Sequence, residues 1–141
     1  MAFITLNSST PDAEAMVVRE INRAKVRHLV RVISPDLAGL RRIRQLDAKI
    51  HLGLHIGGRL PAILEAKALG AEVLLPRWNA ASPSFIRRAH LASMLVIPWT
   101  VDSPRQMWRT ILKGADGIIT NYPAKLTQTV TRLQKKRPVI Y

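Results

Sequence analysis

The sequence of 141 residues contains no cysteine, so it forms no disulfide framework, no thiolate metal site and no cysteine nucleophile. Carboxylates are scarce, because 9 Asp and Glu stand against 22 Lys and Arg, which gives a formal net charge of +13. No stretch reaches the roughly 18 uninterrupted apolar residues that a membrane span needs. The first residues show no basic stretch followed by an apolar run, which predicts no export signal and a cytoplasmic location.

A repeated unit runs along the chain. It consists of a short apolar run, a Ser or Thr followed by Pro, and a helical pattern, with a period of roughly 20 to 26 residues. The predicted strands are residues 3–6, 29–33, 50–56, 72–75, 95–99 and 117–120. The predicted helices are residues 12–25, 36–46, 60–69, 83–92, 104–113 and 123–135.

The helix boundaries are predicted by capping residues. A hydroxyl side chain followed by Pro supplies an N-cap and a first helical residue whose missing N–H costs nothing. Four such pairs precede helices: Thr10-Pro11, Ser34-Pro35, Ser82-Pro83 and Ser103-Pro104. Gly70 and Gly114 stand where a left-handed residue would end the preceding helix.

Six strand-helix units with short loops imply a parallel sheet covered by helices, in an α/β fold. Two architectures have this pattern, the open doubly wound sheet and the (β/α) barrel. A Gly-x-Gly-x-x-Gly turn, typical of the first, is absent, and Gly57-Gly58-Arg59 comes nearest to it. A barrel has eight units, of which six are present here.

Two blocks of sequence resemble the C-terminal signature of the glycerophosphodiester phosphodiesterase family. They are residues 97–102 (IPWTVD) and 113–123 (KGADGIITNYP), where the family has Trp-Thr-Val-Asn and then Gly-Val-Asp-Gly-Ile-Ile-Thr-Asp-Tyr-Pro. Residues 32–36 (VISPD) and 50–54 (IHLGL) resemble two earlier strands of that family. The resemblance spans most of the chain.

The resemblance implies a (β/α)8 barrel hydrolase that cuts phosphoric diesters of glycerol, in lipid metabolism, with a divalent cation such as Mg²⁺ or Ca²⁺. Its catalytic groups lie mainly on the first three strands, the third ending in Glu-x-Lys. This chain aligns from the third strand, with Thr5 and Asn7 in place of those two residues. We therefore expect an incomplete TIM-type (β/α) barrel of about six of the eight units, formed by a single domain over residues 1–137 with a tail at 138–141. We expect no catalytic residue, metal ligand or bound cofactor in this chain, and no hydrolysis by it alone.

Three residues are predicted to bind the substrate. Trp99 ends a strand on the face where barrels carry their active sites, and the resemblance implies that it lines the substrate pocket. The alternative is a half-buried aromatic residue that packs under a loop. His55 and Arg59 flank a Gly-Gly pair at the top of the third predicted strand, where they are candidates to bind an anion.

Other polar residues are weaker candidates. His51 and His55 lie four apart on one strand and share a face, but two histidines without a third ligand are poor support for a metal site. Asp102 and Asn121 are expected near the same end of the sheet, with no partner identified for either.

The charge of +13 leaves a second function open, that of a non-catalytic basic module that binds anionic lipid or nucleic acid. Nonspecific binding to polyanions is expected in either case. An unrelated small α/β enzyme is a third reading, disfavoured because no carboxylates converge in the sequence. An incomplete barrel also has unpaired sheet edges, so we expect self-association.

Overall fold

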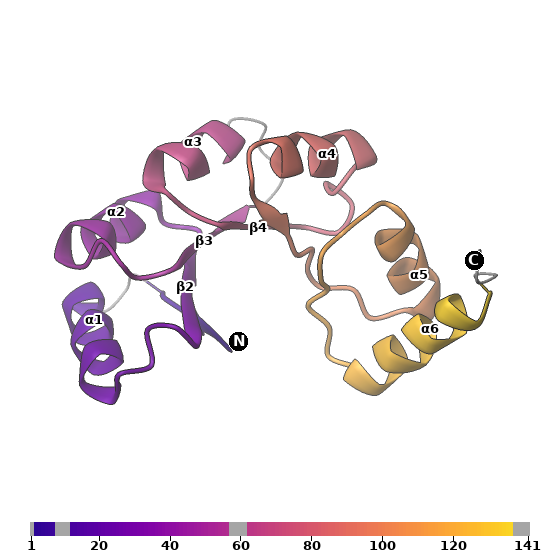
Figure 1. The fold of residues 1–141 in the computed structure, drawn as a ribbon, viewed down its shortest axis with the longest axis horizontal. Helices are drawn as coiled ribbons and strands as arrows, with labels where there is room; N and C mark the ends of the chain where they lie inside the picture. Colours follow the sequence, from indigo (N-terminus) through magenta and orange to yellow (C-terminus); the bar gives the residue numbers. More distant parts are fainter. Residues whose placement is uncertain (1, 8–11, 57–61, 137–141) are drawn as a thin grey trace, which may run out of the picture.

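The computed structural model describes residues 2–7, 12–56 and 62–136, in which five strands alternate with helices (Figure 1). The strands are β1 (Ala2–Thr5), β2 (Val30–Ser34), β3 (Leu52–Ile56), β4 (Val73–Pro76) and β5 (Leu95–Val96). The helices are α1 (Ala13–Ala24), α2 (Leu37–Leu46), α3 (Ala62–Leu69), α4 (Pro83–Leu91), α5 (Pro104–Leu112) and α6 (Pro123–Lys136).

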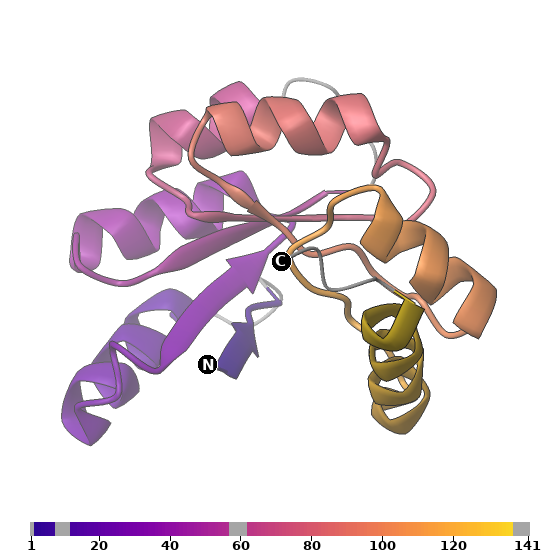
Figure 2. The ribbon, with the colours of Figure 1, turned by 45° about the vertical axis from the view of Figure 1, so that its right-hand side comes forward.

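The five strands form one parallel sheet in the order β1-β2-β3-β4-β5, so each strand pairs with its neighbour in the sequence. A doubly wound sheet reverses its strand order at one point, whereas a barrel does not. The strands line the inner side of an arc whose outer side is covered by helices, with α1 and α6 at its two ends (Figures 1 and 2). The predicted incomplete (β/α) barrel with a parallel sheet is confirmed.

The prediction of a last strand over residues 117–120 is wrong. Residues 117–120 form no strand, and β5 ends at Val96 although we expected it to reach Trp99. The N–H groups of Ile97 and Trp99 still donate to Leu74 O and Pro76 O, but Pro76 on β4 has no N–H to donate back, which interrupts the regular ladder beyond Val96. The backbone of residues 116–119 still runs alongside β5 and the residues after it, because Asp116 N–H donates to Val96 O and Ile119 N–H donates to Pro98 O, both at 3.0 Å.

Two of the four predicted N-caps are confirmed. The hydroxyls of Ser82 and Ser103 accept hydrogen bonds from the backbone N–H groups three residues later, and Pro follows each. The prediction for Ser34 is wrong, because Asp36 is the N-cap of α2 and accepts from the N–H of Ala38. Thr10-Pro11 lies outside the described residues.

Ser34 has a different role, since its side chain is completely buried. Its Oγ donates to Leu6 O at 3.0 Å and accepts from Asp36 N–H at 3.1 Å. The hydroxyl thus joins the residue after β1 to the start of α2. Gly70 and Gly114 do adopt positive φ, at 68° and 96°, and both helix ends are confirmed.

The sheet separates two apolar clusters. The larger cluster fills the space between the sheet and the helices, where Leu40, Leu52 and Leu74 are fully buried. The smaller one lies on the inner side and consists of Ile33, Val73, Leu75 and Ile97. Gly53 lies between these residues, because a Cβ on it would lie 2.9 Å from Ile33 Cγ2 and 3.1 Å from Leu75 Cδ1. The side chain of Trp99, which lies beyond the end of β5, packs on this inner cluster.

Within the described residues, no helix combines the length and apolar character that crossing a bilayer requires. The domain boundary at residue 137 and the tail at 138–141 stay a prediction, since residues 137–141 lie outside the described part.

Candidate functional site

All strands of a parallel sheet end at the same edge, and in barrels this edge carries the active site. His55 is near the end of β3, and Trp99 follows β5 on the other side of β4. Their rings stack with centroids 4.2 Å apart and an angle of 19° between the planes. The tertiary structure therefore brings together two of the three predicted site residues. The third, Arg59, lies outside the described residues.

The Trp99 ring contacts Leu75, the inner apolar cluster and Arg77. Its Nε1–H donates to Leu75 O at 2.7 Å, and the ring packs on the inner apolar cluster. Arg77, which follows β4, places its guanidinium 5.6 Å from the centre of the Trp99 ring. Arg77 was not predicted; the signal in the sequence is that it follows the predicted strand 72–75, and the structure places it directly opposite Trp99.

The imidazole of His55 is partly buried, and burial disfavours its charged form. Burial lowers the pKa of His55 below its ordinary value of 6.5, because the surroundings favour the neutral ring. The neutral ring of His55 is therefore favoured at pH 7, and in this form it offers one donor and one acceptor nitrogen. Arg77 supplies a cation beside the Trp99 ring at this edge.

Asp102 connects two loops of the same edge, which corrects the expectation that it lacks a partner. Its Oδ1 accepts from Thr120 Oγ1 at 3.0 Å and from Asn121 N–H at 2.9 Å, while Oδ2 accepts from Asn121 Nδ2 at 2.9 Å. The hydrogen bond from the Asn121 backbone N–H is the main reason why the pKa of Asp102 lies below its ordinary value. The carboxylate fixes the loop after Trp99 against the loop before α6.

His51 lies at the opposite end of β3, where it takes part in an ion cluster. Its Nδ1 is 2.5 Å from Glu72 Oε1, and Glu72 Oε2 accepts from Arg31 at 3.0 Å. Burial raises the pKa of Glu72, but the hydrogen bonds from His51 and Arg31 outweigh this effect, so the net shift is downward. His51 and His55 thus have different partners and do not converge on one ion.

The divalent cation implied by the resemblance does not fit the described residues. Mg²⁺ and Ca²⁺ need several carboxylate or carbonyl oxygens around one point. At this edge of the sheet β1 is followed by Asn7 and ends in Thr5, both without a carboxylate, and the oxygens of Asp102 are engaged by Thr120 and Asn121. In the parts of the chain that the structure describes, no three His, Cys, Asp or Glu side chains are grouped so as to hold a metal ion.

Comparisons with known proteins agree with this geometry. The sequence model of the Glycerophosphoryl diester phosphodiesterase family matches residues 4–125. A curated relative, the glycerophosphodiester phosphodiesterase of Caldanaerobacter subterraneus subsp. tengcongensis, is 26% identical over 123 residues, which are 86% of this chain and 51% of the relative.

Solved structures show the same fold. A Silicibacter pomeroyi protein assigned to this family superposes with a TM-score of 0.85 at 21% identity, over 94% of this chain and 50% of that one. An Oleispira antarctica phosphodiesterase in complex with the product sn-glycerol-3-phosphate superposes with a TM-score of 0.78 at 16% identity, over 85% of this chain and 49% of that one.

The chain spans about half the length of the relatives that it matches. The family model nevertheless covers most of its residues, and the partial barrel has the family's fold. The chain belongs to the glycerophosphoryl diester phosphodiesterase family.

Proposed function

We propose that this chain forms part of the wall of a cleft that binds glycerophosphodiesters, with Trp99, His55 and Arg77 in contact with the substrate. The observation that carries the proposal is the stacked pair of His55 and Trp99 at the carboxyl edge of the sheet. A flat ring offers an apolar surface to the C–H groups of glycerol, and Arg77 beside it offers a cation to the phosphate. The family and the neighbour that holds sn-glycerol-3-phosphate support this assignment.

Neutral His55 suits a binding role. An uncharged imidazole can donate to a phosphoryl oxygen or accept from a glycerol hydroxyl without the cost of burying a charge. Asp102 acts indirectly, since it holds the loop that follows Trp99 and makes three hydrogen bonds within the protein. Arg59 stays a candidate for the same cleft.

We further propose that the chain by itself does not hydrolyse the diester. Cleavage requires a group that activates the attacking oxygen and another that protonates the leaving alkoxide. Family members generally depend on a divalent cation, and Thr5 and Asn7 do not replace the charge that a Glu would supply to one. His55 stacks on Trp99 at this edge. To bind a divalent cation there, the cleft would need further carboxylates besides those of the described residues.

The experiment measures binding and turnover separately. The 141-residue chain is titrated with sn-glycerol-3-phosphate and with glycerophosphocholine, and binding is followed by calorimetry. The variant Trp99→Leu should weaken binding by about tenfold, since the loss of an aromatic contact of about 1.4 kcal/mol corresponds to that factor.

Trp108→Leu is the matched control, because Trp108 on α5 is 46% exposed and lies outside the cleft. Equal weakening by both substitutions would refute the binding proposal. Turnover of glycerophosphocholine above background with Mg²⁺ or Ca²⁺, retained through purification, would refute the second proposal and leave the first intact.

Self-association through the open sheet edge is also a proposal. In the described part of the chain, β1 pairs with β2 alone, so its other edge presents unpaired backbone groups. Sedimentation of the chain over a range of concentrations tests this, and a monomer at every concentration would contradict it.

A further inference from the structure

The positive charge is concentrated in the second half of the chain. Residues 73–141 hold eleven Lys and Arg against two Asp and no Glu, so they carry +9 of the net +13. Both acids are engaged, since Asp102 accepts from Thr120 and Asn121, and Asp116 accepts from His90 and from Val96 N–H. Few carboxylates therefore remain to neutralise the cations of α4 and α5.

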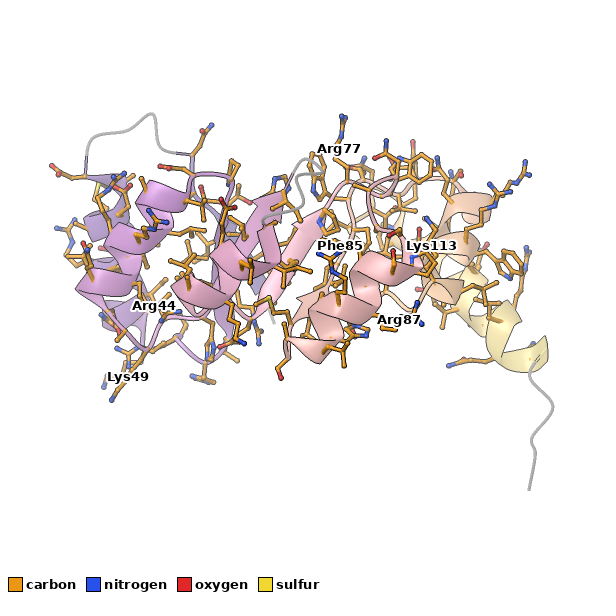
Figure 3. All side chains as sticks on the ribbon, turned by 90° about the horizontal axis from the view of Figure 1, so that it is seen from above. Arg44, Lys49, Arg77, Phe85, Arg87 and Lys113 are labelled. Carbon is orange, nitrogen blue, oxygen red and sulfur yellow. The ribbon has the colours of Figure 1, made fainter. Side chains whose placement is uncertain are left out.

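A groove on the outer side of the barrel gathers two of these cations. It has a volume of about 450 Å³ and lies between α4 and the turn that ends α5. Arg87 of α4 and Lys113 of the turn line it, and both are seen on this face in Figure 3. Neither has an ion pair or a side-chain hydrogen bond among the described residues. None of the residues that line this outer groove belongs to the group of His55, Arg77 and Trp99.

Among the described residues, the acid bonded to the lining residue His90 is Asp116, and other groups engage its carboxylate. Asp116 Oδ2 lies 2.8 Å from His90 Nε2 and 2.7 Å from Val96 N. The Asp116 carboxylate is thus engaged by the imidazole and a backbone donor, and it forms no ion pair with Arg87 or Lys113.

Apart from His90, which is bonded to Asp116, the remaining wall is apolar. Ile86 is almost fully buried, and Leu91 is 82% exposed at the end of α4. Gly114, with φ at 96°, ends α5 without a side chain, and the nearest atom to a Cβ placed on it would be Ile86 Cγ2 at 3.8 Å. The glycine leaves the space beside Ile86 open.

We propose that this outer groove binds a phosphate-bearing ligand, with the phosphate between Arg87 and Lys113 and a short apolar group on Ile86 and Leu91. Two cations with no carboxylate partner attract a dianion, and the guanidinium of Arg87 can bind two phosphate oxygens at once. The apolar wall favours an ester over free phosphate, because the organic group then covers Leu91. The phosphate belongs either to a soluble ester or to a lipid headgroup. The proposal does not depend on the function of the cleft at Trp99.

The test uses the 141-residue chain at 0.15 M salt, where the long-range attraction between charges is largely screened. Three probes are compared: inorganic phosphate, phenyl phosphate, and vesicles of phosphatidylcholine with phosphatidylglycerol. Binding of the soluble probes is followed by the NMR shift of the Gly114 backbone amide, and binding to vesicles by co-sedimentation.

The double variant Arg87→Gln/Lys113→Gln is compared with Arg88→Gln/Arg109→Gln, which removes two exposed charges of α4 and α5 that lie outside the groove. The first should weaken phenyl phosphate binding at least tenfold, and the second less than twofold. Inorganic phosphate should bind more weakly than phenyl phosphate. Thermal unfolding of both variants establishes that they are folded.

The outcomes separate the sources of the phosphate and test the site. Binding of phenyl phosphate without vesicle binding assigns the groove to soluble esters, and loss of vesicle binding in the first variant alone assigns it to lipid headgroups. Equal weakening in both variants, or a Gly114 amide that does not shift with any probe while the chain is folded, would overturn the proposal.

Discussion

Replacing Trp99 by Leu should destabilise the protein by an amount that follows from two contacts. The indole stacks on His55 at 4.2 Å, and such an aromatic pair contributes about 0.5 to 1.5 kcal/mol beyond its area. Its Nε1–H also donates to Leu75 O at 2.7 Å, and a hydrogen bond of this kind contributes a net of about 0.5 to 1.5 kcal/mol. Trp99→Leu removes both contacts, so we expect the free energy of unfolding to fall by about 1 to 3 kcal/mol.

Trp99→Phe separates the two contributions, because phenylalanine keeps a ring that can stack on His55 but has no N–H for Leu75 O. We expect it to lose about half of the stability that Trp99→Leu loses. Trp108→Leu is the control on α5, and because the 46% exposed Trp108 makes neither of these two contacts, we expect it to lose less stability than Trp99→Leu.

Urea unfolding at pH 7, followed by circular dichroism, gives the free energies, and equal m-values establish that the unfolded states are comparable. A Trp99→Leu variant as stable as the wild type would refute this account of the edge. Equal losses in the Phe and Leu variants would assign the whole effect to the hydrogen bond. NMR titration gives a second measure, since exposure of His55 in Trp99→Leu should raise its pKa toward 6.5.

Three further predictions concern the scaffold. Ser34→Ala leaves the buried Leu6 carbonyl without its hydroxyl donor and should cost about 1 to 3 kcal/mol in urea unfolding. Gly53→Ala places a Cβ where the inner cluster leaves no room and should cost about 1 to 3 kcal/mol; unchanged stability would mean that the strands can move apart. The hydrogen bond from Arg42 holds the pKa of Glu14 below 4.5, so its contribution to stability is present above pH 4.5 and is lost as the pH falls through the lowered pKa. Glu14→Gln should flatten this part of the pH profile of unfolding, and an unchanged profile would contradict the assignment.

Much of the fold follows from local patterns in the sequence. Ser82 and Ser103 followed by Pro placed the starts of α4 and α5 correctly, and Gly70 and Gly114 placed two helix ends. These signals work because capping and left-handed backbone involve residues only a few positions apart. Ser34 was misread by the same rule, because its hydroxyl is used by Leu6, 28 residues away.

The candidate site was only partly predictable. Trp99 and His55 were identified from the positions at which they follow their strands, but Arg77 was missed because it lies in no recognised motif. The partners of Asp102 were also missed, since Asn121 is 19 residues further along the chain and a different loop carries it. Sequence spacing identifies residues at the edge and leaves open which of them meet.

The sequence by itself determined the alternation of strands and helices, the family and the excess of positive charge. Apolar periodicity, capping residues and composition are properties of neighbouring residues, so they can be read before the chain folds. The tertiary structure decided that the strands follow one another in order around an arc, that His55 stacks on Trp99, and that none of the described residues lining the groove with Arg87 and Lys113 carries a carboxylate. These features depend on contacts between segments 20 or more residues apart, which form only when the sheet and its covering helices fix both segments in space.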